Sequence, residues 1–313
     1  MEIAAVAAQE RIAAELLPLP ADPGGRLADA ECARVEVALF SEDIYPDWSR
    51  QFFSAVRKAP RLKWLHTFAA GVDHAIYVEL IERGVRLTGS SGAAAEPIAH
   101  TAIMGMLALA RRMPHWLAAQ RRRAWDPIRG PDGLPPDLRE QTALVIGLGR
   151  IGGEIARLAR AFGLHVIGVR RGARRPEDPV DELHPPQALP DLLPRADWLF
   201  LACPLTPETR GLIDAAAIAR LPRGARVINV ARGKIVAEPA LVEALASGRL
   251  GGAYLDVFDT EPLPADSPLW DMPNVLVSPH NATISAGNES RVRVIFLENL
   301  RRWGRGEPLL HEA

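Results

Sequence analysis

From residue 142 onward, the chain alternates between unbroken apolar runs and segments with helical spacing. The runs show no polar alternation, which is typical of strands buried on both faces of a parallel sheet. Between the first two runs, Ile155, Leu158 and Phe162 fall on one helical stripe, which ends at Gly163. Repeated units of this kind predict an α/β fold with a doubly wound parallel sheet. The six runs are 143–147, 165–169, 198–203, 226–231, 253–258 and 275–279.

The N-terminal part of the chain shows a sparser version of the same pattern. Apolar runs at 35–40 and 62–68 flank a segment with helical spacing, which predicts a further α/β layer. A long helical pattern covers about 95–120, and the segment 125–138, with four prolines and three aspartates, predicts a loop. Residues 290–304 fit an amphipathic helix.

Composition narrows the class of protein. The 313 residues are 48% hydrophobic and carry a net charge of −1, so no bulk field favours nucleic acid or an anionic membrane. The longest apolar helical run, 101–110, is about half a membrane span. Cys32 and Cys203 are far apart and without metal-ligand spacing, and no signal peptide is recognisable. We expect a cytoplasmic protein with no metal, no nucleic-acid partner and no membrane contact.

A glycine-rich turn follows the first apolar run and opens the first helix. Gly147, Gly149 and Gly152 fit the pattern G-x-G-x-x-G. The first glycine permits a tight turn, the second lets a pyrophosphate approach the backbone, and the third lets helix and strand pack closely. Because the helix start offers free N–H groups, this turn with Arg150 and Ile151 predicts a dinucleotide site.

The second run ends in Arg170 and Arg171, where an acid usually binds a ribose hydroxyl. Guanidinium groups match phosphate oxygens bidentately, so these residues predict that NADP(H) is preferred, with NAD(H) possible. Arginine supplies 34 of the 37 basic residues, so chance placement is the alternative explanation.

Three chemistry-bearing residues follow later strands, namely Arg232, Glu261 and His280. Ligands of such sheets lie at the carboxyl ends of the strands, so we expect these side chains to converge. An arginine can bind the carboxylate and carbonyl of a 2-keto acid, and a histidine can supply the proton. A carboxylate beside that histidine raises its pKa and orients its ring.

Several motifs in order make the chain resemble the D-isomer-specific 2-hydroxyacid dehydrogenase family, and within it the glyoxylate/hydroxypyruvate reductases. The motifs are AAGVDH (69–74), GLGRIG (147–152), CPLTPETRGLID (203–214), NVARG (229–233), DVFDTEPLP (256–264) and SPH (278–280). The resemblance implies two Rossmann-like domains and a homodimer. The cofactor domain, 95–284, would be inserted into a substrate domain made of 1–94 plus 285–313.

The resemblance also implies residue roles. His280 would be the acid/base, Glu261 its partner, and Arg232 a substrate ligand. Backbone N–H groups of Gly71 and Val72 would bind the substrate carboxylate. The remaining cofactor contacts would come from Cys203, Pro204, Thr209, Val230 and Asp256.

Two departures and two alternatives accompany this interpretation. His100 stands where the family often has glutamate, and HNATIS (280–285) departs from the usual sequence after the histidine. One alternative is an NAD-dependent, phosphoglycerate-like D-2-hydroxyacid dehydrogenase. The other is a non-catalytic, dinucleotide-sensing protein of the corepressor type. The sequence leaves open which 2-keto acid is used and in which direction the reaction runs.

Overall fold

The computed structural model describes residues 2–69, 71, 74–129 and 134–313. The chain divides into two compact units. One unit combines Met1–Ala94 with Ser285–Ala313, and the other is the continuous segment Ala95–Ile284. Each unit is built on its own parallel sheet, so the predicted α/β class is confirmed.

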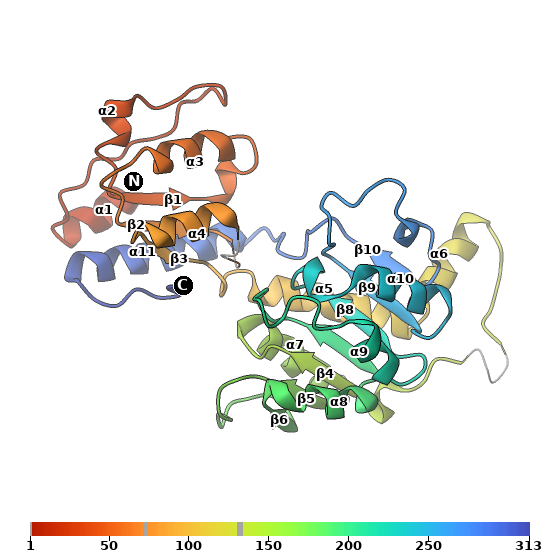
Figure 1. The fold of residues 1–313 in the computed structure, drawn as a ribbon. Coiled ribbons are helices and arrows are strands. Elements are labelled where there is room, and N and C mark those ends of the chain that lie inside the picture. Colours follow the sequence, from red (N-terminus) through yellow and green to blue (C-terminus); the bar gives the residue numbers. More distant parts are fainter. Residues whose placement is uncertain (1, 70, 72–73, 130–133) are drawn as a thin grey trace. The chain divides into compact units, whose positions relative to one another are not determined.

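The continuous unit contains a seven-stranded parallel sheet in the order β10-β9-β8-β7-β4-β5-β6 (Figure 1). Strand order reverses at β4, which is the point where doubly wound sheets bind ligands. The strands are β4 (Thr142–Ile146), β5 (His165–Val169), β6 (Glu182–His184), β7 (Trp198–Leu201), β8 (Arg226–Asn229), β9 (Gly252–Leu255) and β10 (Val275–Val277). The helices are α5 (Ala95–Ala110), α6 (Met113–Arg121), α7 (Arg150–Ala161), α8 (Leu189–Leu192), α9 (Ala215–Arg220) and α10 (Glu238–Ala246).

Helices cover both faces of this sheet. On one face, Leu144 and Leu199 join a core with residues of α8, α9 and α10. Side chains alternate across a strand, so Tyr254 belongs to the other face. There α5 packs so closely that a Cβ on Gly105 would clash with the Tyr254 ring, and α5 also contacts α7. Burial on both faces explains why these strands are continuous apolar runs.

The discontinuous unit is smaller and has two helical layers around a three-stranded parallel sheet, ordered β1-β2-β3. Residues of α3 and α4 pack on one face, and on the other Trp64 of β2 stacks on Phe296 and Trp303 of the last helix. The strands are β1 (Val37–Phe40), β2 (Trp64–Thr67) and β3 (Arg86–Thr88). The helices are α1 (Glu2–Gln9), α2 (Asp29–Cys32), α3 (Ser49–Arg57), α4 (Ala75–Glu82) and α11 (Asn288–Arg305).

The strand and helix predictions hold with three differences. All six apolar runs contain strands, but the sequence pattern missed β3 and β6, which are three residues long and include polar positions. The helix expected over about 95–120 is two helices, because Arg112 adopts a left-handed conformation with φ of 55° between α5 and α6.

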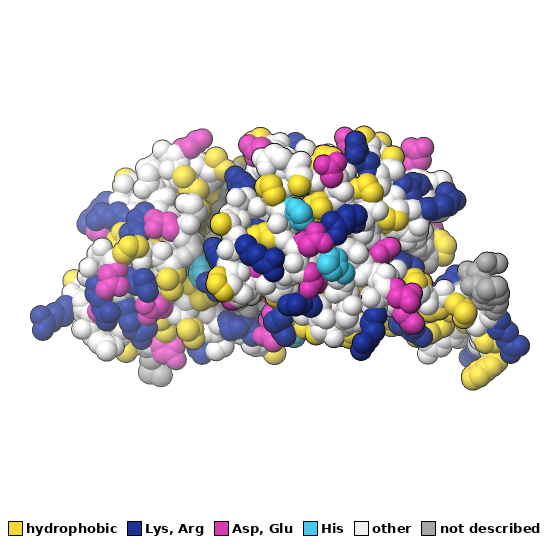
Figure 2. Space-filling view, turned by 90° about the horizontal axis from the view of Figure 1, so that it is seen from below, with side chains coloured by type: hydrophobic (Ala, Val, Ile, Leu, Met, Phe, Trp, Pro, Cys, Tyr) yellow, Lys and Arg dark blue, Asp and Glu magenta, His cyan; other side chains and the backbone are white. Residues whose placement is uncertain are grey.

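Charged side chains of both signs are interspersed on the face shown in Figure 2, as the balanced composition implies. Among the helices of the described residues, none has the length and apolar character needed to cross a bilayer.

Candidate active site

The glycine turn has the geometry of a dinucleotide site. Gly147 has φ of 93°, and a Cβ there would lie 2.6 Å from the backbone nitrogen of Cys203. A Cβ on Gly152 would clash with the carbonyl oxygen of Gly147. Gly149, which caps α7, has open space where its Cβ would be. Two glycines are therefore required by packing, and the third leaves the helix start open to a ligand. The open start of α7 can therefore accommodate the pyrophosphate of a dinucleotide.

Strand β5 delivers Arg170 directly beside this turn. The N–H of Gly147 donates to the carbonyl of Val169 at 2.9 Å. The Arg170 side chain does not extend into solvent, because its Nη1 and Nη2 donate to Asp178 Oδ1 and Oδ2 at 2.8 and 2.7 Å. Arg171 is exposed. The two predicted phosphate ligands therefore differ: one is paired with a carboxylate and the other faces solvent.

The predicted cofactor contacts after β7 and β8 lie at the same edge of the sheet. Cys203 is buried, and burial raises the pKa of its thiol to about 11, so it is a poor nucleophile. Thr209 Oγ1 donates to the carbonyl of Pro204 at 2.7 Å, which closes the loop that follows β7. Val230 is buried directly after β8. The side chains of these residues build the loop, so their backbones are what a cofactor could contact.

His280 and Glu261 form the chemical centre of the site. His280 Nδ1 donates to Glu261 Oε2 at 2.8 Å, and the two side chains are 45% and 36% exposed. This hydrogen bond raises the pKa of His280, although burial and the charge of Arg232 act to lower it. Burial acts to raise the pKa of Glu261, but hydrogen bonds from His280 and from the Phe258 N–H lower it overall. The pair therefore favours an imidazolium beside a carboxylate, as a proton donor requires.

Asp256 fixes the loop that carries His280. Its carboxylate accepts hydrogen bonds from Ser278 Oγ at 2.5 Å and from the N–H groups of Asn281 and Ala282 at 2.9 and 3.1 Å. Its carbonyl accepts the N–H of His280 at 2.9 Å. These contacts hold His280 in a left-handed conformation, with φ of 54°. The structure therefore gives buried Asp256 a positioning task, and its contact with the cofactor stays a prediction.

The third predicted residue, Arg232, acts on this pair through its positive charge, which lowers the pKa of both Glu261 and His280. The loop after β8 is held by Asn229, whose Nδ2 donates to the carbonyl of Arg232 at 3.1 Å. A Cβ on Gly233 would clash with the backbone of Phe258. Glycine at this position thus lets the Arg232 loop lie against the segment that leads to Glu261. The three predicted residues converge at one edge of the sheet.

Some predicted positions lie elsewhere. Gly71 follows β2 in the discontinuous unit, and Val72 falls outside the described residues. His100 is on α5, exposed, 3.9 Å from Glu96. In the described part of the chain, no cluster of three or more His, Cys, Asp or Glu side chains could hold a metal.

Sequence reasoning missed Asp178 and Gly233. Asp178 is an acid eight positions after Arg170, and that spacing was the available signal. Gly233 directly follows Arg232, but its contact with Phe258 joins segments 25 residues apart, which periodicity does not reveal.

Known proteins are similar to this chain in sequence and in fold. Residues 103–282 match the family described as D-isomer specific 2-hydroxyacid dehydrogenase, NAD binding domain. A glyoxylate reductase of Korarchaeum cryptofilum is 35% identical over 259 residues, which cover 80% of this chain and 75% of the relative. A D-3-phosphoglycerate dehydrogenase of Methanocaldococcus jannaschii is 34% identical over 258 residues, covering 80% of this chain and 47% of that protein.

Among solved structures, the NADPH-dependent glyoxylate/hydroxypyruvate reductase of Sinorhizobium meliloti in complex with NADP and sulfate superposes with a TM-score of 0.80. It is 30% identical, and the match covers 100% of this chain and 94% of that one. The expected two-domain Rossmann arrangement is confirmed by this likeness. The chain belongs to the family of D-isomer specific 2-hydroxyacid dehydrogenases, which are NAD(P)-dependent oxidoreductases.

Proposed function

We propose that this protein reduces small 2-keto acids of the glyoxylate and hydroxypyruvate type to D-2-hydroxy acids, with NADPH as the preferred cofactor. The observation that carries the proposal is the 2.8 Å hydrogen bond between His280 and Glu261 at the carboxyl edge of a sheet that also carries an open glycine turn. In this proposal the continuous unit binds the cofactor and the discontinuous unit binds the substrate.

The proton comes from His280. Glu261 occupies Nδ1, which leaves Nε2 as the nitrogen that donates to the carbonyl oxygen of the substrate. NADPH, when bound, supplies the hydride that reaches the carbonyl carbon. One hydride and one proton together convert the C=O group to CH–OH, and Glu261 stabilises the imidazolium until the proton leaves.

The substrate anion is bound by fixed donors. Arg232 supplies a permanent positive charge near His280 and can hold the carboxylate and the carbonyl oxygen in one orientation. The family resemblance also predicts the backbone N–H groups of Gly71 and Val72 as ligands of the substrate carboxylate, and Val72 lies outside the described residues. Because Arg232 also lowers the pKa of His280, it helps the proton to leave during the reaction.

The test is oxidation of NADPH followed by absorbance with glyoxylate, hydroxypyruvate, pyruvate and phenylpyruvate as a panel. We expect turnover with glyoxylate and hydroxypyruvate, and the rates with pyruvate and phenylpyruvate show how far the substrate class extends. Folded protein that oxidises NADPH with none of them would overturn the proposal. If His280→Ala and Glu261→Ala leave the biological effect of the protein unchanged, the dinucleotide-sensing alternative gains instead.

One observation favours a second candidate, an NAD-dependent D-2-hydroxyacid dehydrogenase. The Arg170 charge is balanced by Asp178, which weakens the case for a 2′-phosphate at that position. The relative from Methanocaldococcus jannaschii carries the name of such an enzyme. Oxidation of D-3-phosphoglycerate with NAD, measured beside the panel above, distinguishes the two candidates.

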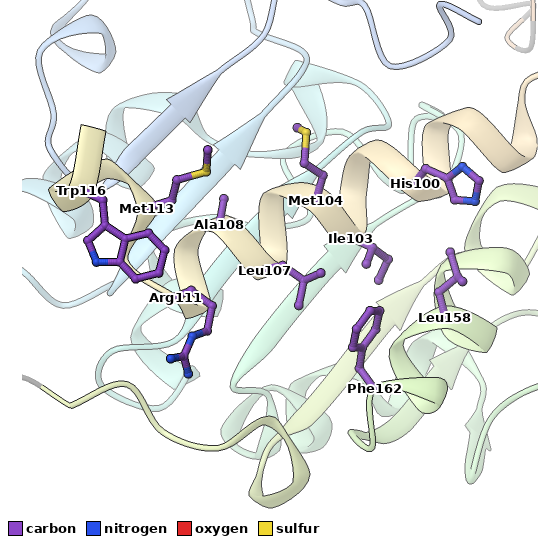
Figure 3. Close-up of a pocket in the computed structure, with 10 residues that line it drawn as sticks. All are labelled: His100, Ile103, Met104, Leu107, Ala108, Arg111, Met113, Trp116, Leu158 and Phe162. Carbon is purple, nitrogen blue, oxygen red and sulfur yellow. The ribbon is translucent and has the colours of Figure 1, made fainter. Parts of the chain in front are cut away.

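The proposal includes a homodimer formed through the continuous unit. In Figure 3, side chains of α5, α6 and the end of α7 surround one apolar hollow of about 530 Å³. Met104, Trp116 and Phe162, which line it, are 54%, 49% and 43% exposed. An apolar surface of this kind is typical of an interface, and a two-fold dimer is the default for soluble oligomers.

We expect Met104→Glu to convert a dimer to a monomer in light scattering after gel filtration, because it places a charge in this hollow. The matched control is Val294→Glu on α11, where the side chain is 63% exposed and outside the hollow. A wild-type monomer, or a control that dissociates equally, would contradict the proposed interface.

A further inference from the structure

The loop between β5 and β6 contains a buried ion pair that the reaction does not use. The Arg170 and Asp178 side chains are 15% and 8% exposed, and two hydrogen bonds of 2.8 and 2.7 Å join the guanidinium to the carboxylate. Asp178 also accepts the N–H of Arg175 at 2.7 Å. The pair therefore closes the loop upon itself and fixes the Arg170 side chain inside it.

This pairing leaves Arg170 little capacity for another anion. Nη2 also donates to the carbonyl of Ala173, so both terminal nitrogens are engaged. Nε is buried and has no hydrogen-bond partner among the described residues. A phosphate that binds a guanidinium bidentately needs two of these donors. The guanidinium has five N–H donors, of which these contacts use three, and the Nε–H is buried. On the Nη1–Nη2 edge, a phosphate could obtain two donors only by displacing the Asp178 carboxylate, which would then be a poorly solvated, unpaired charge.

Arg171 is the contrasting neighbour. It is exposed, and its charge lowers the pKa of Glu208, to which Thr206 Oγ1 also donates a hydrogen bond. Glu208 lies on the loop after β7, whose first residues, Ala202 and Cys203, lie against Gly147. The tip of β5 therefore presents one accessible cation rather than two, with an acid near each arginine.

We infer that Asp178 is a specificity-determining residue for the cofactor. Its carboxylate competes with a 2′-phosphate for Arg170. The preference of the protein for NADP(H) over NAD(H) is therefore smaller than the two arginines would produce without Asp178. The inference deepens the proposed function and rests on it for the identity of the dinucleotide. The inference assigns the remaining preference for NADP(H) over NAD(H) chiefly to Arg171.

The decisive experiment measures binding of NADP⁺ and NAD⁺ to the full chain by calorimetry, without any 2-keto acid. Asp178→Asn removes the charge and keeps an oxygen acceptor for the Arg175 N–H. We expect the ratio of the NAD⁺ dissociation constant to the NADP⁺ one to rise on the order of tenfold, with NAD⁺ affinity nearly constant. The matched control is Glu177→Gln, which removes the same charge from the adjacent exposed residue and should change the ratio less than twofold or so.

Two results would overturn the inference. If Asp178→Asn weakens NADP⁺ binding, Asp178 orients Arg170 for the phosphate instead of competing with it. If the ratio stays constant, the pair has no part in selection. Should the amide collapse the loop, seen as a lower Tm with loss of both cofactors, Asp178→Ser is held to the same expectation. Because no substrate is present, a failure of 2-keto acid reduction would sink the proposed function without deciding this measurement.

Discussion

Two ends of the same sheet edge carry the same kind of pair, a nitrogen base joined to a carboxylate. After β9 and β10, His280 Nδ1 lies 2.8 Å from Glu261. After β5, Arg170 lies 2.7 Å from Asp178. An imidazole titrates near neutral pH, so its carboxylate changes the pKa and with it the supply of protons. A guanidinium stays charged, so its carboxylate can only balance that charge. Similar geometry thus serves proton transfer at one end and charge balance at the other.

The two pairs also differ in how the loops that carry them are packed. The His280 loop is bound by three hydrogen bonds to the Asp256 carboxylate, by one to the Asp256 carbonyl, and by the close approach of Gly233 to Phe258. The Arg170 loop is closed mainly by its own ion pair, and a Cβ on Gly172 would meet only Arg170 Nε, at 3.6 Å. The His280 loop is therefore fixed by residues that follow neighbouring strands of the sheet, whereas the loop after β5 is fixed mainly by its own ion pair.

The largest expected effect comes from removing the proton donor. His280→Ala should lower kcat for 2-keto acid reduction by about 10²–10⁴, as for the loss of a general acid. The matched control is His165→Ala. His165 also lies 2.8 Å from a glutamate, Glu182, and is 44% exposed, but it begins β5 at the opposite edge of the sheet. Steady-state rates that fall equally in both variants would show that a histidine–carboxylate pair alone does not define the site.

A smaller effect should follow from crowding each loop. In Gly233→Ala the new methyl group would clash with the Phe258 backbone, so we expect a loss of about 1–3 kcal/mol in the free energy of unfolding and a lower kcat. Gly172→Ala should stay within about 0.5 kcal/mol of wild type. Chemical denaturation of both variants checks this. Equal losses in the free energy of unfolding would contradict the difference in packing between the loop at Gly233 and the loop at Gly172.

Much of the fold could be predicted from the sequence, because strands buried on both faces have few residue types to choose from. The prediction failed at β6, where Glu182 and His184 are half-buried at the sheet edge and carry no apolar signal. It also joined α5 to α6, because the left-handed residue at the break is Arg112 rather than a glycine, although Pro114 in the first turn of α6 is a helix-start signal.

The sequence predicted more of the candidate site around His280 than around Arg170. Arg232, Glu261 and His280 follow strands that are neighbours in the sheet, so topology alone brings them to one edge. Their roles follow from the chemistry of the three side chains and from a family resemblance, and they remain proposals. The pairing of Arg170 with Asp178 was not predicted: a spacing of eight residues places an acid near the arginine, but the path of an irregular loop decides which of several nearby acids and arginines meet.

The most direct test of the central claim is the pH profile of kcat/KM for 2-keto acid reduction in wild type and Glu261→Gln. Reduction needs protonated His280, so the rate should fall as pH rises through its pKa, which Glu261 holds above 6.5. Without the carboxylate, burial and the charge of Arg232 still lower this pKa, so the fall in rate should move to lower pH, and above the pKa the rate should drop about tenfold for each further pH unit. A falling limb at the same pH in both proteins would contradict the account.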